Sequence, residues 1–213
     1  MKLIWHGHSC FEMDFEGGPR VIADPFDAKV GYPVCKAEAD VVTNSHAHMD
    51  HNYIAELAGN FSRLNRPGRF VFEDLIVTGV ESFHDAEGGA KRGSNILFLY
   101  EAEGLKIAHL GDLGHMPDEA QFAALADLDV MLIPIGGFYT IDTETAVEIV
   151  RRAKPRIAVA MHFLTAPMKF PISDEKRFVQ LTGARYVGTK EIEITRGNIG
   201  EMAGAIVLEY PRE

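Results

Sequence analysis

The chain has 213 residues, a formal net charge of −10 and 46% hydrophobic residues, a composition that excludes a fibrous or wholly disordered protein. Its length predicts one domain over residues 1–213. The negative charge, without a stripe rich in Lys and Arg, makes nucleic acid an improbable partner. No stretch reaches the roughly 20 apolar residues of a membrane span and no signal-peptide pattern opens the chain, so we expect a cytoplasmic protein without membrane contact.

The first half of the chain predicts mainly antiparallel strands. Residues 2–15 alternate loosely and continue through a glycine turn into residues 21–24, which is typical of a β-hairpin. A valine-rich strand over 39–43 leads into a polar segment, and a short helix is expected over 53–58, closed by Gly59. The other strands expected in this half lie within 70–83, 95–100 and 105–110.

After Asp112 the pattern changes to alternating helices and strands, which is typical of α/β layers. Pro117 suits the first position of a helix, and Asp142 suits a helix N-cap. Two β-rich stretches, each followed by helices, predict two sheets with helices on the outside. The elements expected here are helices over 117–126, 142–153 and 173–181, and strands over 130–134, 157–161, 191–195 and 205–210.

Residues 45–51, SHAHMDH, follow the valine-rich strand directly and are called the histidine-rich loop below. Because an extended backbone points residues i and i+2 to the same side, His46 and His48 can converge on one ion. A turn would then aim Asp50 and His51 at a second ion a few ångströms away, as two-metal hydrolysis requires. The pattern His-x-His-x-Asp-His is more specific than most short motifs, and it predicts a dinuclear metal site.

Three further candidate ligands stand where predicted strands meet loops: His84, Asp112 and His162. Strand ends are where α/β proteins gather their sites. A single histidine at such a place is more often an ordinary hydrogen-bonded residue. Three such ends together with the histidine-rich loop favour metal ligation.

The motifs together resemble the metallo-β-lactamase superfamily, most closely its L-ascorbate-6-phosphate-lactonase-like branch of metal-dependent hydrolases. The resemblance spans nearly the whole chain and implies an α/β (α+β) fold, a four-layer αββα sandwich with metals at one edge of the two sheets. Beside the histidine-rich loop it is carried by WHGHSC (5–10), IADP (22–25), GDLGH (111–115), IPIGG (133–137) and AMHF (160–163).

The resemblance implies two divalent ions, with Zn²⁺ expected first and Mn²⁺ or Fe²⁺ as alternatives. The ligands that it implies are His46, His48 and His84 for the first ion, Asp50, His51 and His162 for the second, and Asp112 as the bridge between them.

The other histidines divide into two pairs. His8 and His115 lie in segments that resemble loops near the metals of the family, where they would contact substrate or support a ligand. The alternative for both is an ordinary structural role. His6 and His109 fall within strands, and we expect them to satisfy local hydrogen bonds.

Asp24 and Tyr139 complete the candidate site. Asp24 ends its strand toward the same edge, and we expect it to anchor the histidine-rich loop by accepting hydrogen bonds from backbone or imidazole N–H groups. Tyr139 follows two glycines and could line a substrate pocket. Packing of the connection, with Thr140 or Asp142 capping the next helix, is an equal alternative.

These residues predict a hydrolase in which metal-bound hydroxide, oriented by Asp50 or Asp112, attacks an ester, lactone, amide or phosphodiester of a small molecule. One alternative is a diiron-type oxidoreductase on the same fold. Its relatives usually carry an acidic residue where this chain has His48, and also a flavin domain that 213 residues cannot accommodate. The other is a non-catalytic metal-binding protein, which a full set of ligands disfavours. A homo-oligomer is possible, and Cys10 and Cys35 are expected to be reduced thiols.

Overall fold

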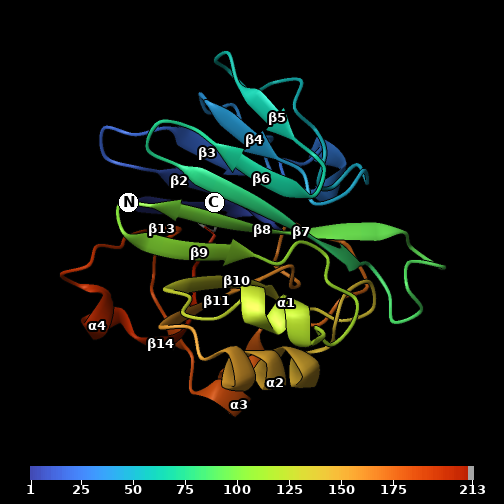
Figure 1. Cartoon of the computed structure of the whole chain (residues 1–213). Helices are drawn as coiled ribbons and strands as arrows, with labels where there is room; N and C mark the ends of the chain where they lie inside the picture. The colour runs from blue at the N-terminus through green and yellow to red at the C-terminus, as the bar shows by residue number, and fades with distance from the viewer. Residues whose placement is uncertain (211–213) are drawn as a thin grey trace.

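The computed structural model describes residues 1–210 and contains two β-sheets stacked face to face (Figure 1). The six-stranded sheet has the order β13-β1-β2-β3-β4-β5 and the eight-stranded sheet the order β12-β14-β11-β10-β9-β8-β7-β6. This mixed arrangement confirms the predicted fold class. The first sheet is built from β1 (Lys2–Gly7), β2 (Cys10–Asp14), β3 (Arg20–Ala23), β4 (Val41–Thr43), β5 (Ser62–Leu64) and β13 (Glu191–Glu193).

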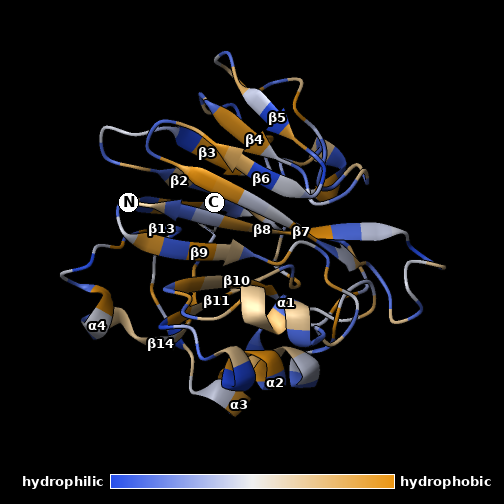
Figure 2. Ribbon diagram, viewed as in Figure 1, coloured by the Kyte–Doolittle hydropathy of each residue, from blue (hydrophilic) through white to orange (hydrophobic). Residues whose placement is uncertain are grey.

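The eight-stranded sheet combines an antiparallel half with a parallel half. Every residue of β10 and β11 is buried, as expected for parallel strands covered on both faces. Figure 2 shows hydrophobic residues along β3, β4 and β10. The strands of this sheet are β6 (Gly68–Val71), β7 (Ile76–Phe83), β8 (Ser94–Ala102), β9 (Leu105–His109), β10 (Val130–Pro134), β11 (Ile157–Met161), β12 (Arg185–Tyr186) and β14 (Gly204–Val207).

The main core fills the space between the sheets. Trp5 and Phe11 from the first sheet and Phe98 and Leu132 from the second are at most 1% exposed and belong to one continuous cluster. Burial of each such side chain contributes about 1.5–3 kcal/mol. The two sheets therefore form a single packed body, which fixes the relative position of loops from both halves of the chain.

Helices cover the outer face of the eight-stranded sheet: α1 (Glu119–Ala124), α2 (Thr143–Ala153) and α3 (Lys176–Thr182). Asp142 caps α2, as predicted, by accepting a hydrogen bond from the Thr145 N–H. Helix α1 begins later than predicted, because Asp118 rather than Pro117 sets its start, through a capping box with Gln121. A short α4 (Ile199–Met202) was not predicted.

Loops and the 3-10 helix η1 (Ala28–Val30) cover the outer face of the six-stranded sheet, where Ile22 and Val42 pack against Phe26 and Ile54. The helix predicted over 53–58 does not form, and that prediction was wrong. The N–H groups of Tyr53 and Ala58 donate instead to the distant carbonyls of Pro25 and Ala37. These tertiary hydrogen bonds take donors that a helix over this segment would need, and nucleation of a short helix is unfavourable without further support.

Two short strands, β5 and β12, were also missed; each has only two or three residues. Within residues 1–210, no helix is long and apolar enough to span a lipid bilayer.

Candidate metal centre

The histidine-rich loop and the residue before it are hydrogen-bonded to both sheets. The N–H of Asn44, just before it, donates to Leu64 O at 2.9 Å, and the carbonyl of Ser45 accepts from the Ile96 N–H in β8 at 3.0 Å. The loop closes in a turn in which the His51 N–H donates to His48 O at 3.0 Å. The turn bends the chain between His48 and His51, so the side chains of the loop point in two directions.

Asp24 holds this loop by three hydrogen bonds, the kind of contact expected of it. Its carboxylate accepts from the Ser45 N–H at 2.7 Å and from the Ser45 hydroxyl at 2.6 Å, and it lies 2.7 Å from His51 Nδ1. Because Ser45 gives its proton to Asp24, His46 Nδ1–H must donate to Ser45 Oγ, 3.0 Å away. Both imidazoles therefore keep Nδ1–H and present the lone pair of Nε2 to the site.

The first ligand cluster consists of His46, His48 and His84, whose nearest ring nitrogens lie within 4.8 Å of one another. Neighbouring rings are 4.5–5.1 Å apart between centroids. His84 directly follows β7 and is buried, whereas His48 is exposed. This cluster contains only imidazoles and opens toward solvent.

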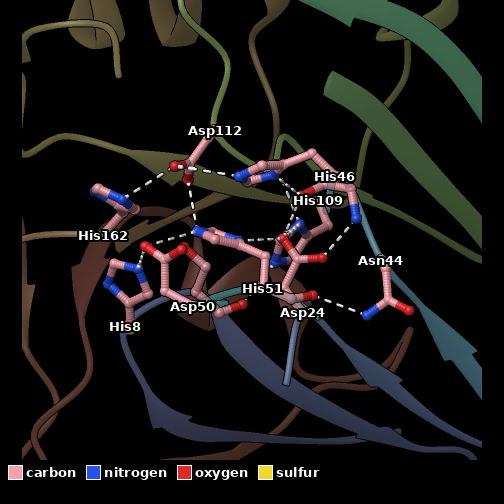
Figure 3. A network of polar contacts seen from close by, with 12 residues as sticks. His8, Asp24, Asn44, His46, Asp50, His51, His109, Asp112 and His162 are labelled. Carbon is pink, nitrogen blue, oxygen red and sulfur yellow. Dashed lines mark hydrogen bonds and ion pairs between the residues drawn. The ribbon is translucent and has the colours of Figure 1, made fainter. Parts of the chain in front are cut away.

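The second ligand cluster consists of His8, Asp50, His51 and His162, again with ligand atoms within 4.8 Å (Figure 3). Asp50 Oδ2 lies 3.4 Å from His8 Nε2 and 3.8 Å from His51 Nε2. The rings of His8 and His162 are 4.2 Å apart between centroids, and the three histidines are fully buried. His8, expected only to touch substrate or support a ligand, thus stands among the candidate ligands themselves.

Asp112 contacts residues of both clusters, and Figure 3 shows it with His46 of the first cluster and His51 and His162 of the second. Its Oδ1 is 3.1 Å from His51 Nε2, and its Oδ2 is 3.2 Å from His84 Nε2 and 3.3 Å from His162 Nε2. The carboxamide of Asn95 accepts a hydrogen bond from the Asp112 N–H at 2.9 Å and fixes the turn that carries it. One carboxylate therefore reaches nitrogens of both clusters.

The donor set fits divalent cations. Buried atoms of this centre have no hydrogen-bond partner within residues 1–210, among them His46 Nε2, His51 Nε2 and both ring nitrogens of His162. Buried polar atoms are rarely left unpaired. Imidazole and carboxylate donors without thiolates suit Zn²⁺, Mn²⁺ or Fe²⁺, and these orphan atoms are the ones such ions would bind.

The electrostatics of the centre also call for a cation. Burial, reinforced by the neighbouring His51, lowers the pKa of His46 to about 3, and burial with His162 lowers the pKa of His8 to about 4, so both rings are neutral donors at pH 7. Burial opposes charge on His51 too, but the carboxylates of Asp112, Asp50 and Asp24 outweigh it and raise the pKa of this ring. Without a bound ion the positive partner that these buried carboxylates require is the His51 ring itself, protonated on Nε2 as well as Nδ1. A divalent ion would replace the proton on Nε2, because a metal ligand must be deprotonated at the binding nitrogen.

The backbone is strained at three positions of the centre. His8, Asp24 and His162 have φ angles of 52°, 47° and 51°, in the left-handed region that side chains rarely adopt. Each stands where a strand ends, and such strain persists where the surrounding structure enforces it, commonly at functional sites. A Cβ on Gly136 would lie 2.2 Å from His162 O, so only glycine lets the backbone at residue 136 pass this close to the backbone of His162.

The other candidate histidines have structural partners. His109 Nε2 lies 2.8 Å from Ser9 O, and its Nδ1 accepts from the Gly111 N–H. His115 Nε2 accepts from the Phe83 N–H at 3.2 Å, and its Nδ1 lies 2.9 Å from Met116 O, so this ring secures the end of β7 just before His84. His6 bonds Glu12 at 2.9 Å, away from the clusters.

Tyr139 is linked to the second cluster through Phe170. It is half-buried beside Phe170, whose ring is 5.7 Å from that of His8, and it carries the guanidinium of Arg92 over its face. Sequence reasoning missed Arg92 and Phe170, and it also missed Ser45 and Asn95 as supports of the ligands. Ser45 adjoins the histidines and Asn95 interrupts an apolar strand, which are the signals that could have identified them.

Comparison with known proteins agrees with this fold and with a metal-dependent enzyme. The model of the β-lactamase superfamily domain matches residues 2–162. A "UPF0173 metal-dependent hydrolase" of Thermoplasma acidophilum is 31% identical over 91% of this chain and 96% of its own. A crystal structure from Thermotoga maritima, named as a Zn-dependent hydrolase of the metallo-β-lactamase superfamily, is 34% identical over 97% of both chains with a TM-score of 0.82. Igni18, a metallo hydrolase of Ignicoccus hospitalis, shares the fold at 22% identity and a TM-score of 0.64.

Fold and centre thus define a protein of the metallo-β-lactamase class. The chain belongs to the β-lactamase superfamily and, within it, to the metal-dependent hydrolases that the Thermoplasma protein represents. This membership confirms the predicted family and the predicted class of enzyme.

Proposed function

We propose that the chain hydrolyses an ester, lactone, amide or phosphodiester bond of a small molecule at a dinuclear centre. His46, His48 and His84 would hold one divalent ion, and Asp50, His51 and His162 the other, with His8 as an added ligand. The observation that supports this proposal is the position of Asp112, within 3.3 Å of ring nitrogens from both clusters. Zn²⁺ is the first candidate, followed by Mn²⁺ and Fe²⁺.

Divalent ions bound there would lower the pKa of water toward about 7 and polarise the carbonyl or phosphoryl oxygen of the substrate. The protein's own contribution is orientation. Asp50 is 17% exposed and Asp112 only 2%, so Asp50 can accept a hydrogen bond from an incoming water while Asp112 holds its position between the clusters. Burial of His8, His51 and His162 keeps other water out and strengthens each charge interaction.

A paired metal and activity assay tests this function. Protein stripped with a chelator would be reconstituted with Zn²⁺, Mn²⁺ or Fe²⁺, its metal content measured, and its activity recorded on a panel of small esters, lactones, amides and phosphodiesters. We expect close to two ions per chain and turnover of at least one bond class only after reconstitution. Full metal occupancy without turnover of any class would contradict the hydrolase and favour a metal-binding role.

A further inference from the structure

Arg92 stands beside the first ligand cluster on a firmly held loop. The His84 N–H donates to the carbonyl of Gly93, the next residue, at 3.0 Å. The carboxylate of Asp85 accepts four backbone N–H groups of the loop at 2.8–2.9 Å, including that of Arg92 itself. The backbone of Arg92 is therefore fixed relative to His84.

A row of side chains leads from Arg92 to the second cluster. The guanidinium carbon of Arg92 lies 5.6 Å from the centroid of the Tyr139 ring, Tyr139 lies 6.1 Å from Phe170, and Phe170 lies 5.7 Å from His8. These residues come from three separate loops. Tyr139 precedes α2, and Phe170 follows His162 in the loop after β11. The row thus runs from Arg92, whose loop is hydrogen-bonded to His84, to His8 in the second cluster.

The charge of Arg92 meets no carboxylate within residues 1–210. It is half-buried, yet among residues 1–210 its guanidinium has no hydrogen bond or ion pair. Arg20, Arg177 and Arg196 each contact a carboxylate in this chain of net charge −10, whereas Arg92, like Arg66, lies over an aromatic ring instead. A guanidinium offers five N–H donors in a planar fork, and stacking on an aromatic ring orients that fork. A fork of this shape binds a carboxylate or phosphoryl group through two parallel hydrogen bonds.

We propose that Arg92, oriented by Tyr139, binds an anionic group of the substrate, while the rings of Tyr139 and Phe170 contact an apolar or planar part. The substrate is then an anionic small molecule whose carboxylate or phosphoryl group lies apart from the bond that is cleaved. This inference rests on the proposed function, because the bound molecule is a substrate only if the protein hydrolyses it. Two divalent ions would carry more positive charge than Asp50 and Asp112 neutralise, which also suits an anionic ligand.

The test uses binding of small probes to the metal-reconstituted protein. Phenylphosphonate and benzoate carry a ring and an oxyanion, and benzyl alcohol is their neutral counterpart. Affinities would be measured by calorimetry for the wild-type protein, Arg92→Gln and Arg92→Lys, with metal content recorded for each. Arg66→Gln is the matched control, because Arg66 also lies over an aromatic ring, 5.4 Å from that of Phe70, in the connection between β5 and β6.

We expect Arg92→Gln to weaken binding of at least one anion about tenfold, with benzyl alcohol and metal content unchanged, and Arg92→Lys to restore part of the loss. The anion that loses more identifies the carboxylate or the phosphoryl group. Unaltered anion binding in Arg92→Gln, or an equal loss for benzyl alcohol or in Arg66→Gln, would overturn the proposal. Anion binding that depends on Arg92 in a protein without hydrolytic turnover would refute the hydrolase function and leave the anion site in place.

Discussion

The two ligand clusters differ in size, burial and charge. His46, His48 and His84 form an all-imidazole cluster in which His48 is exposed. The second cluster has its own carboxylate, Asp50, and three fully buried histidines. Its members also come from more distant parts of the chain, because His8 precedes the histidine-rich loop by more than thirty residues and His162 follows it by more than a hundred. The difference predicts that an ion held by the first cluster would exchange with solvent more readily, whereas an ion held by the second would depend on the complete fold.

The variant that should affect both clusters at once is Asp112→Asn. Loss of the central charge leaves nitrogens of both clusters without their shared carboxylate, so we expect turnover to fall on the order of 10³-fold and metal content to fall below one ion per chain. Metal analysis and steady-state kinetics measure both effects. Asp129→Asn is the control, because Asp129 is equally buried but pairs with Arg156 and Arg196; a similar metal loss there would refute a specific role for Asp112.

His162→Ala should weaken the second cluster and leave the first intact. The second ion loses a ligand while the first keeps its three imidazoles, so about one ion per chain should remain and most activity should be lost. Each bound ion stabilises the native state by about 2.7 kcal/mol at a hundredfold excess over Kd. Chelation should therefore lower the melting temperature by several degrees less in the variant than in the wild-type protein. An unchanged response to chelator would show that His162 binds no ion, and His8 would then be the ligand to test.

Asp24→Asn should weaken both clusters moderately. Asp24 orients His51 directly and His46 through Ser45, which places one dependent ligand in each cluster. An amide cannot accept all of these protons, and loss of such a supporting group typically costs about 10- to 100-fold in metal affinity. Competition with a fluorescent chelator measures it. A loss confined to one ion would show that Asp24 supports only one of the two histidines.

A structural feature could be predicted from the sequence when the residues that determine it lie close together in the chain. The boundaries of β10 and β11 were predicted to the residue, because each is a continuous apolar run that begins after a charged residue and leads into a glycine pair or a histidine. The histidine-rich loop was equally clear, since its candidate ligands lie within six residues. The helix over 53–58 failed because partners more than twenty residues away bind its backbone. Arg92 and Phe170 were missed for a related reason, because only the packed loops bring them together.

A smaller effect concerns titratable groups outside both clusters. A hydrogen bond from Cys10 and the neighbouring His6 outweigh burial and lower the pKa of Cys35 to about 5, while bonds to Cys35 and Glu12 outweigh burial and raise the pKa of His6 to about 9. The pair is therefore charged between these values. Thiolate absorbance in the ultraviolet should appear as pH rises through about 5 and be absent in Cys35→Ser. Absorbance that appears only above pH 8, near the ordinary thiol pKa, would contradict this assignment.

The central claim, that two clusters hold two ions about Asp112, is tested most directly by anomalous diffraction from a crystal of the Zn²⁺-reconstituted protein. We expect two peaks, one within roughly 2.0–2.2 Å of nitrogens of His46, His48 and His84, the other at similar distances from Asp50, His51 and His162. Asp112 should contact both ions. A single peak at either cluster, or two peaks with Asp112 bound to neither, would contradict the dinuclear centre.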